Sequence, residues 1–296
     1  MIQNSKKVKP ERASLFSHIY VFSLISYAKT ERRDGMKKSV HIFFLKRRYL
    51  LALAVLAVSA GIFYAVNYPA AQAAYAADRQ LPIYCVDCGD DKRCAISFDA
   101  AWGNEDTQTL IDILAKYNVK ATFFVVGDWA EKYPESVKAL HDAGHEVMSH
   151  SAHHDHYNSL SAQQIVADVQ ASCAKIEAVT GECPMLIRCP YGEYDDHVIS
   201  AIRSIGMEPI QWSVDSLDWK DYDADTIYDR VTSRLEPGSI VLFHNAALHT
   251  PEALPSILEY MIKQGYTVVP ISELIIDGAY TIDHTGKQCP ATAAQG

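Results

Sequence analysis

The chain lacks the sequence signatures of several common protein classes. No glycine-rich loop that could cradle phosphates precedes a predicted helix, so we expect no nucleotide cofactor. The formal net charge is −9 and five basic residues lie within residues 37–48, so the remainder is acidic and nucleic acid is not an expected partner. Cys85 and Cys88 have no second such pair at a useful spacing, which argues against a four-cysteine zinc site.

One long apolar run lies near the N-terminus. Residues 49–68 contain no charge, and a run of 20 residues is about the length that crosses the hydrocarbon core of a bilayer. We expect a transmembrane anchor or a signal peptide there, with the basic segment 1–48 cytoplasmic and everything after the run outside. Two small-residue patterns within residues 71–76 resemble signal peptidase sites, so anchored and secreted forms both stay open. Because Met-Lys-Lys at 36–38 resembles the start of a secretory signal, residues 1–35 can be an upstream extension.

Seven short apolar runs follow residue 92. Each is bounded by turn residues and is rich in β-branched or aromatic side chains, as buried strands are. The runs are CAISFD, ATFFVVG, HEVMSH, MLIRCP, MEPIQWS, SIVLFH and TVVPIS. Stretches with a helical pattern alternate with them, at residues 107–117, 134–143, 161–180, 195–205, 225–235 and 251–265.

This alternation predicts an α/β fold. Near-continuous hydrophobic strands separated by helices indicate parallel strands joined by right-handed crossovers. The region 93–277 is short for a full barrel of eight units, so we expect a distorted, incomplete (β/α) barrel of about seven parallel strands. Residues 69–92 are interpreted as a linker and residues 278–296 as a C-terminal tail.

Five reactive side chains stand at or just past the ends of separate runs: Asp99, His150, Arg188, Asp215 and His244. In a (β/α) barrel the side chains that leave the carboxyl ends of the strands converge on one mouth, where catalysis takes place. We therefore expect these five residues to share one pocket.

Four histidines lie within residues 150–156, directly after a predicted strand. Neutral imidazole is a common ligand for zinc and similar ions, and His150 and His154 can converge if the loop turns. A solvated polar loop is the simpler alternative. The clustering at a strand end favours a metal site.

The carboxylates have catalytic and structural interpretations. Asp99 can act as a general base or a metal ligand, or can be a turn residue. Arg188 can hold Asp99 ionised, or can form a structural ion pair. Asp215 and His244 can form an orienting pair in which the carboxylate raises the pKa of the imidazole and favours a protonated general acid; a lone histidine would more often be structural.

Five ordered segments carry a family resemblance. They are Phe98-Asp99 followed by Trp102-Gly103, His150-Ser151-Ala152-His153-His154, Arg188-Cys189-Pro190-Tyr191-Gly192, Asp215-Ser216-Leu217-Asp218-Trp219 and Leu242-Phe243-His244. In this order they resemble the motifs of the polysaccharide deacetylases, the NodB-homology enzymes of carbohydrate esterase family four. The resemblance implies the NodB-homology fold and a metal-dependent hydrolase that removes acetyl groups from N-acetylated sugars in peptidoglycan, chitin or related glycans.

The resemblance also implies roles for individual residues. Asp99 resembles the general base that activates water, and Arg188 resembles its orienting partner. His150 and His154 resemble the imidazole ligands of a divalent metal, for which zinc is the expected ion.

On the other side of the reacting bond, His244 resembles the acid that protonates the departing amine, and Asp215 resembles the carboxylate that tunes it. The backbone N–H of Tyr191 is the implied donor to the oxyanion. Trp219 and Leu242 could shape an apolar pocket for the acetyl methyl group, or could simply belong to the core.

One position departs from the family pattern. The residue after Asp99 is usually a second aspartate that binds the metal, but here it is Ala100, whose methyl group cannot do so. Two histidines with water, or Asp128, Asp155 or His156 as a substitute ligand, are open alternatives. The Phe-Asp-Ala-Ala-Trp-Gly form resembles a sporulation-associated branch of bacterial deacetylases.

These observations lead us to expect an extracytoplasmic peptidoglycan deacetylase, membrane-anchored or secreted. Its expected partners are an N-acetylated glycan and the membrane. One alternative is a metal-independent hydrolase of other C–N bonds. The other is a glycan-binding cell-envelope protein without catalysis, which Ala100 supports.

Overall fold

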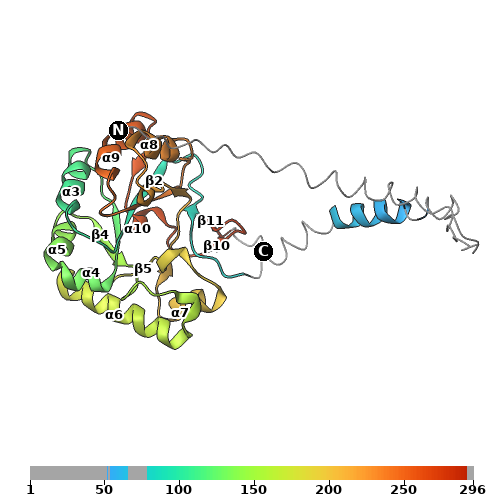
Figure 1. Ribbon diagram of the computed structural model, residues 1–296, viewed down its shortest axis with the longest axis horizontal. Coiled ribbons are helices and arrows are strands. Elements are labelled where there is room, and N and C mark those ends of the chain that lie inside the picture. The colour runs from blue at the N-terminus through green and yellow to red at the C-terminus, as the bar shows by residue number, and fades with distance from the viewer. Residues whose placement is uncertain (1–51, 53, 66–78, 292–296) are drawn as a thin grey trace, which may run out of the picture. The chain divides into compact units, whose positions relative to one another are not determined.

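The computed structural model describes residues 52, 54–65 and 79–291 (Figure 1). The chain divides into two units, residues 1–63 and 64–296, and the fold below is that of the second. Residues 54–65 are helical, but no helix in the described ranges is both long and apolar enough to cross a membrane. The basic segment 1–48 and the rest of the run 49–68, apart from residue 52, lie outside the described residues. The membrane anchor or signal peptide therefore stays a prediction.

A curled sheet of parallel strands forms the centre of the second unit. Its order is β6-β5-β4-β3-β2-β8-β7, and β9 pairs with the beginning of β2. The strands are β2 (Arg93–Ala100), β3 (Thr122–Val125), β4 (Glu146–Ser149), β5 (Leu186–Ile187), β6 (Glu208–Pro209), β7 (Val214–Asp215), β8 (Ile240–His244) and β9 (Thr267–Val268). Each of these pairings is parallel. Strands β6 and β7 lie at the two ends of this order and, among the described strands, do not pair with each other. The sheet therefore does not close, and the predicted incomplete (β/α) barrel is confirmed as a half-barrel.

Helices connect the strands; most pack along the outside of the sheet (Figure 1), whereas the short α10 contributes to the inner cluster. They are α3 (Thr107–Lys116), α4 (Gly127–Lys132), α5 (Pro134–Asp142), α6 (Ala162–Thr180), α7 (Asp196–Ser204), α8 (Ala224–Thr232), α9 (Thr250–Lys263) and α10 (Ile271–Leu274). The six predicted helices are confirmed. The short elements α4, α10 and β7 were not predicted, because a few residues are too short a window for a periodic pattern.

The central strand β2 shows how the sheet separates core from site. Alternate residues of a strand point to opposite faces. Cys94, Ile96 and Phe98 belong to the outer cluster packed against the helices, whereas Ala95 belongs to an inner cluster with Ile83 and residues of α10. Asp99 lies four residues after Ala95 and therefore points to the same face of the strand. The inner cluster thus fills the end of the half-barrel where the strands begin, and the polar Asp99 stands at the end where they finish.

Parts of the predicted linker and tail pack onto the domain. Ile83 is fully buried and bridges to Ile210. Strand β1 (Cys85–Val86) joins β11 (Lys287–Pro290) and β10 (Tyr280–Ile282) in a small second sheet of order β1-β11-β10. Residues 69–78 lie outside the described residues. The domain therefore extends before residue 93 and beyond residue 277, because the apolar side chains of Ile83 and Val86 join the inner cluster.

The contact between Gly238 and β1 yields a stability prediction. Gly238 has φ +81°, and a Cβ added there would stand 1.8 Å from the carbonyl oxygen of Val86. Gly181 has the similar φ of +77°, but an added Cβ would meet nothing within 4 Å. Gly181→Ala should therefore lower the free energy of unfolding by about 1–2 kcal/mol through backbone strain alone. Gly238→Ala should cost more than about 3 kcal/mol, because the backbone of β1 must also move.

Urea denaturation of the two variants, with linear extrapolation to water, measures this difference. Equal losses in the two variants would show that the approach of β1 to Gly238 adds nothing to stability.

Candidate active site

A cavity of about 440 Å³ opens at the carboxyl ends of the strands. Eight of the nine predicted site residues line it: Asp99, His150, His154, Tyr191, Asp215, Trp219, Leu242 and His244. The ninth, Arg188, is fully buried and contacts Asp99. The expectation that the side chains at the strand ends share one pocket is confirmed. Trp102, Gly192 and Trp212 also line the cavity and were not predicted as site residues.

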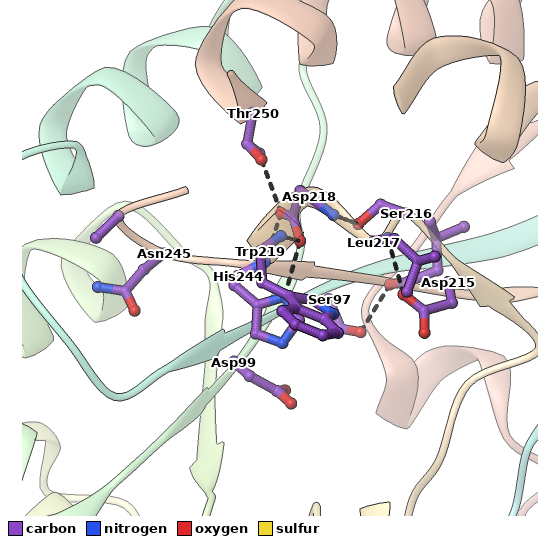
Figure 2. A network of polar contacts seen from close by, with 12 residues as sticks. Ser97, Asp99, Asp215, Ser216, Leu217, Asp218, Trp219, His244, Asn245 and Thr250 are labelled. Atoms are coloured by element: carbon purple, nitrogen blue, oxygen red, sulfur yellow. Dashed lines mark hydrogen bonds and ion pairs between the residues drawn. The ribbon is translucent and has the colours of Figure 1, made fainter. Parts of the chain in front are cut away.

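Strand register brings Asp99 and His244 together. Asp99 lies beside His244 in the parallel pairing of β2 with β8. Neighbouring strands lie about 4.8 Å apart, so two aligned residues with the same facing converge on one space. Figure 2 shows the Asp99 carboxylate and the His244 ring at this common site. The two groups that the sequence places 145 positions apart are therefore neighbours.

Arg188 anchors Asp99. Its Nη1 donates to Asp99 Oδ1 at 2.8 Å, and its Nη2 donates to the carbonyl oxygen of Gln211 at 3.1 Å. The guanidinium also lies over the ring of Phe124, 4.2 Å from its centroid. Burial would raise the pKa of Asp99, but the charge of Arg188, with smaller contributions from His150 and His244, outweighs it and lowers that pKa. Asp99 is thus held ionised at neutral pH.

The ring of His150 is oriented by a backbone carbonyl. Its Nδ1 lies 2.7 Å from the carbonyl oxygen of Arg188, which can only accept, so Nδ1 carries the hydrogen. The lone pair is then on Nε2, which lies 3.6 Å from Asp99 Oδ2. Burial lowers the pKa of His150 and keeps the ring neutral. This is the second-sphere arrangement that metal-binding histidines adopt.

His154 reaches the same place through a strained loop. Its φ is +61°, in the left-handed region that non-glycine residues rarely occupy, and its N–H donates to Ser151 Oγ at 2.9 Å. Its ring centroid lies 4.9 Å from that of His150. Burial, together with the neighbouring His150, lowers the pKa of His154 to about 4. The two rings thus meet edge to face as neutral imidazoles.

These two histidines fit part of a metal site. In the described ranges no group of three or more His, Cys, Asp or Glu side chains is placed to hold a metal ion. Ala100 is 1% exposed and packs in the outer cluster. The protein thus offers two of the three ligands typical of a catalytic zinc site.

Two of the alternative ligands, and the cysteine of the third motif, have other environments. Asp128 accepts hydrogen bonds from His153 and Lys175 at the surface. His156 contacts Glu193 and lies flat against the ring of Tyr191. Burial raises the pKa of the Cys189 thiol to about 12, so this side chain is not an ionised nucleophile.

His244 is oriented by Asp218 (Figure 2). The ring Nδ1 lies 2.8 Å from Asp218 Oδ1, and the backbone N–H of His244 donates to Asp218 Oδ2 at 2.8 Å. Asp218 is fully buried and also accepts from Thr250 Oγ1 at 2.7 Å and from the N–H of Trp219 at 2.9 Å. Burial opposes protonation of His244, but Asp218 outweighs it and raises the pKa of the imidazole.

The predicted pairing of Asp215 with His244 is wrong as a direct contact. Asp215 Oδ1 instead accepts from the N–H of Leu217 at 2.9 Å. Leu217 adopts φ +53°, and this reversal begins the short helix η3 (Asp218–Lys220), which brings Asp218 into contact with His244 at the end of β8. Asp215 lines the cavity and contributes only a weaker charge effect to the pKa of His244. Asp215 and Asp218 belong to the same sequence motif, and only the geometry of the turn decides which of them contacts His244.

Another part of the cavity wall is built on a left-handed turn in the short helix η2 (Pro190–Gly192). Tyr191 has φ +59°, and Gly192 follows with φ +67°. Gln211, which is 2% exposed, donates from Nε2 to the carbonyl oxygen of Gly192 at 3.0 Å. A Cβ on Gly192 would stand 2.8 Å from the ring of Trp212. Gln211 and Trp212, which sequence reasoning missed, thus hold the backbone that presents Tyr191.

The comparisons with known proteins identify the family of this chain. A family model described as polysaccharide deacetylase matches residues 87–210. The chain is similar to the peptidoglycan-N-acetylmuramic acid deacetylase PdaA of Bacillus subtilis, with 30% identity over 191 residues, 63% of this chain and 73% of PdaA. The chain belongs to the polysaccharide deacetylase family. It also resembles the peptidoglycan-N-acetylglucosamine deacetylase PgdA of Listeria monocytogenes, with 35% identity over 62% of this chain but only 39% of PgdA.

A solved structure shares the fold of this polysaccharide deacetylase family member. BA3943 of Bacillus anthracis, described as a pseudoenzyme of the CE4 family, matches with a TM-score of 0.63 and 35% identity, covering 65% of this chain and 68% of BA3943. The relatives of this chain therefore include named peptidoglycan deacetylases and a pseudoenzyme.

The Asp218–His244 contact predicts the titration of this family member. Asp218→Asn should lower the pKa of His244, because the variant removes the hydrogen-bonded charge that favours the imidazolium. Asp215→Asn, the matched control, should lower it less. The pKa of His244 is raised on folding, so its protonation stabilises the fold below the unfolded value of about 6.5, and this contribution disappears as pH rises through the folded pKa.

NMR titration of the ¹⁵N-labelled His244 ring in the three proteins measures these pKa values. A larger decrease of the His244 pKa in Asp215→Asn than in Asp218→Asn would show that Asp215 is the main partner of His244, as the sequence predicts.

Proposed function

We propose that this protein is an extracytoplasmic N-deacetylase that hydrolyses the acetamide of N-acetylated aminosugars in peptidoglycan. The observation that carries the proposal is the placement of an ionised Asp99 beside a His244 that favours protonation, in one cavity of a polysaccharide deacetylase fold. The cell-wall substrates named for PdaA and PgdA support the choice of glycan. The apolar run 49–68 supports the location.

Asp99 is proposed as the general base. Arg188 keeps the carboxylate charged, and its single hydrogen bond to Oδ1 leaves Oδ2 directed toward His150. A water held between Oδ2 and the acetamide carbon can lose its proton to Asp99 as it attacks. The ion pair limits the movement of the base and so fixes where that water must lie.

His244 is proposed as the general acid. An amide nitrogen leaves as an amine only if it receives a proton, because an amide anion is a poor leaving group. Asp218 orients the ring through Nδ1, which leaves Nε2 as the atom that can donate. Asp215 lines the cavity, and its charge favours the same protonated state.

The remaining cavity residues are proposed to bind the substrate. The backbone N–H of Tyr191 is the proposed donor to the developing oxyanion, on the turn that Gln211 holds. Leu242 is 2% exposed and Trp219 is 56% exposed, and both line the cavity. They supply apolar surface for the acetyl methyl group.

His150 and His154 are the residues that would hold a divalent metal, with zinc as the proposed ion. Such a metal would supply polarisation of the acetyl carbonyl and acidification of a bound water. The neutral rings and the fixed tautomer of His150 support this assignment.

The acid and base assignments predict a loss of turnover. Asp99→Asn and His244→Gln should each lower acetate release from peptidoglycan by about 10²- to 10⁴-fold, because each removes one proton-transfer group and keeps a side chain of similar size. Asp142→Asn, an exposed carboxylate on α5, is the control and should have no effect.

Release of acetate is measured enzymatically, with circular dichroism to confirm folding. Near-normal acetate release by both site variants would show that Asp99 is not the general base and His244 is not the general acid.

The metal assignment predicts a difference between neighbouring histidines. His154→Ala should lower zinc affinity at least about tenfold, because it removes one of two protein ligands. His153→Ala, the matched control, should not, since His153 is exposed and contacts Asp128 at the surface. Equilibrium dialysis of the full-length chain gives both affinities. Full deacetylation in the presence of a chelator would favour the metal-independent alternative instead.

Glycan binding without hydrolysis is the second candidate function. Ala100 in place of the family aspartate favours it, as does the resemblance to the pseudoenzyme BA3943. Binding of peptidoglycan with no acetate release, whichever divalent metal is supplied, would select this candidate.

A further inference from the structure

Trp102 is a large apolar side chain left in solvent at the active-site cavity. Its relative exposure is 59%, yet it lines the same cavity as Asp99 and His244. Tyr191 and Trp219, also cavity residues, are 57% and 56% exposed. Exposed apolar surface gathered at one concave site usually marks the place where a ligand binds. The three exposed rings at the mouth of the cavity therefore indicate that a ligand with an apolar surface binds there.

The backbone that carries Trp102 is held firmly. The buried indole N–H of Trp129 donates to the carbonyl oxygens of Trp102 and Gly103, at 2.9 and 2.7 Å. Asn245, 4% exposed, donates from Nδ2 to the same two oxygens and accepts from the N–H of Ala101 at 3.1 Å. Two buried polar side chains therefore fix a turn whose own ring stays in water. A fixed backbone reduces the entropy that this residue loses when a ligand binds.

The cavity and the ring of Trp102 would contact different units of a bound glycan chain. A volume of about 440 Å³ is in the lower part of the range for small-molecule sites, about 300–1,000 Å³, and suits one sugar unit with its acetamide. Adjacent units of a glycan chain must then lie against the rim. Trp102 is on that rim, with its ring edge-to-face against His154 at 5.6 Å between centroids.

We propose that Trp102 is a substrate-positioning residue that stacks against the sugar ring next to the unit whose acetamide enters the cavity. The occupant follows from the proposed function, but the contact itself requires no catalysis. A pyranose presents a face of C–H groups, which packs on an aromatic ring and leaves its hydroxyls in water. The amphipathic indole is suited to such a half-wet contact.

The test is isothermal titration calorimetry of the full-length chain. The ligands are the monosaccharide and tetrasaccharide of N-acetylglucosamine, and a peptidoglycan tetrasaccharide that alternates N-acetylglucosamine with N-acetylmuramic acid. The unaltered chain should bind at least one tetrasaccharide, and Trp102→Ala should weaken that binding about tenfold. Affinity for the monosaccharide should not change, because a single unit occupies the cavity alone.

Two further variants separate stacking from general effects. Trp102→Phe keeps an aromatic face and should retain most of the affinity. Met185→Ala removes a side chain of the same 59% exposure next to β5, outside this cavity, and should leave all affinities unchanged.

Three results would overturn the inference: equal tetrasaccharide affinity in Trp102→Ala, an equal loss for monosaccharide and tetrasaccharide, or no binding of either tetrasaccharide by the unaltered chain. The second result would show that the indole acts through His154 inside the cavity. Acetate release from the same samples keeps the two proposals apart. Binding that depends on Trp102 without acetate release retains this inference and overturns deacetylation, while acetate release together with equal tetrasaccharide affinity in Trp102→Ala does the reverse.

Discussion

The buried ion pair between Asp99 and Arg188 is the interaction on which the rest of the site depends. A carboxylate that is 5% exposed would favour its neutral form, and removal of one partner from such a pair strands a buried charge. Arg188 prevents this with its side chain, while its carbonyl oxygen fixes the tautomer of His150. The flat guanidinium in turn rests on Phe124. One residue thus sets the charge of the proposed base and the orientation of a candidate metal ligand.

The second half of the site uses the opposite arrangement. Asp218, fully buried, receives hydrogen bonds from His244, Thr250 and Trp219, and the cation that it favours is the imidazolium of His244. It raises the pKa of His244, while Arg188 lowers the pKa of Asp99. The two opposite shifts favour an ionised Asp99 beside a protonated His244. Such a separation is what acid–base catalysis at one pH requires.

Much of the fold and of the candidate site could be predicted from local sequence, and the features that such a prediction misses have a common cause. The seven apolar runs were recognised because a strand covered on both faces is continuously hydrophobic. Strand β7 has two residues and offers no such pattern. The position of Asp215 just past an apolar run predicts its pairing with His244, but the left-handed Leu217 brings Asp218 into contact with the ring instead. Residues 69–92 are predicted as a linker because no local pattern reveals the burial of Ile83, whose partner Ile210 is distant in sequence.

The sequence by itself determined the family, the parallel half-barrel and the set of side chains at the strand ends, because hydrophobic periodicity and ordered motifs are local properties of the chain. Tertiary structure alone decided which of those side chains touch. The pairing of His244 with Asp218, the tautomer of His150 and the exposed, anchored ring of Trp102 all depend on turns and on contacts between residues far apart in the chain. Such contacts form only when the strands align in register, and no local pattern encodes them.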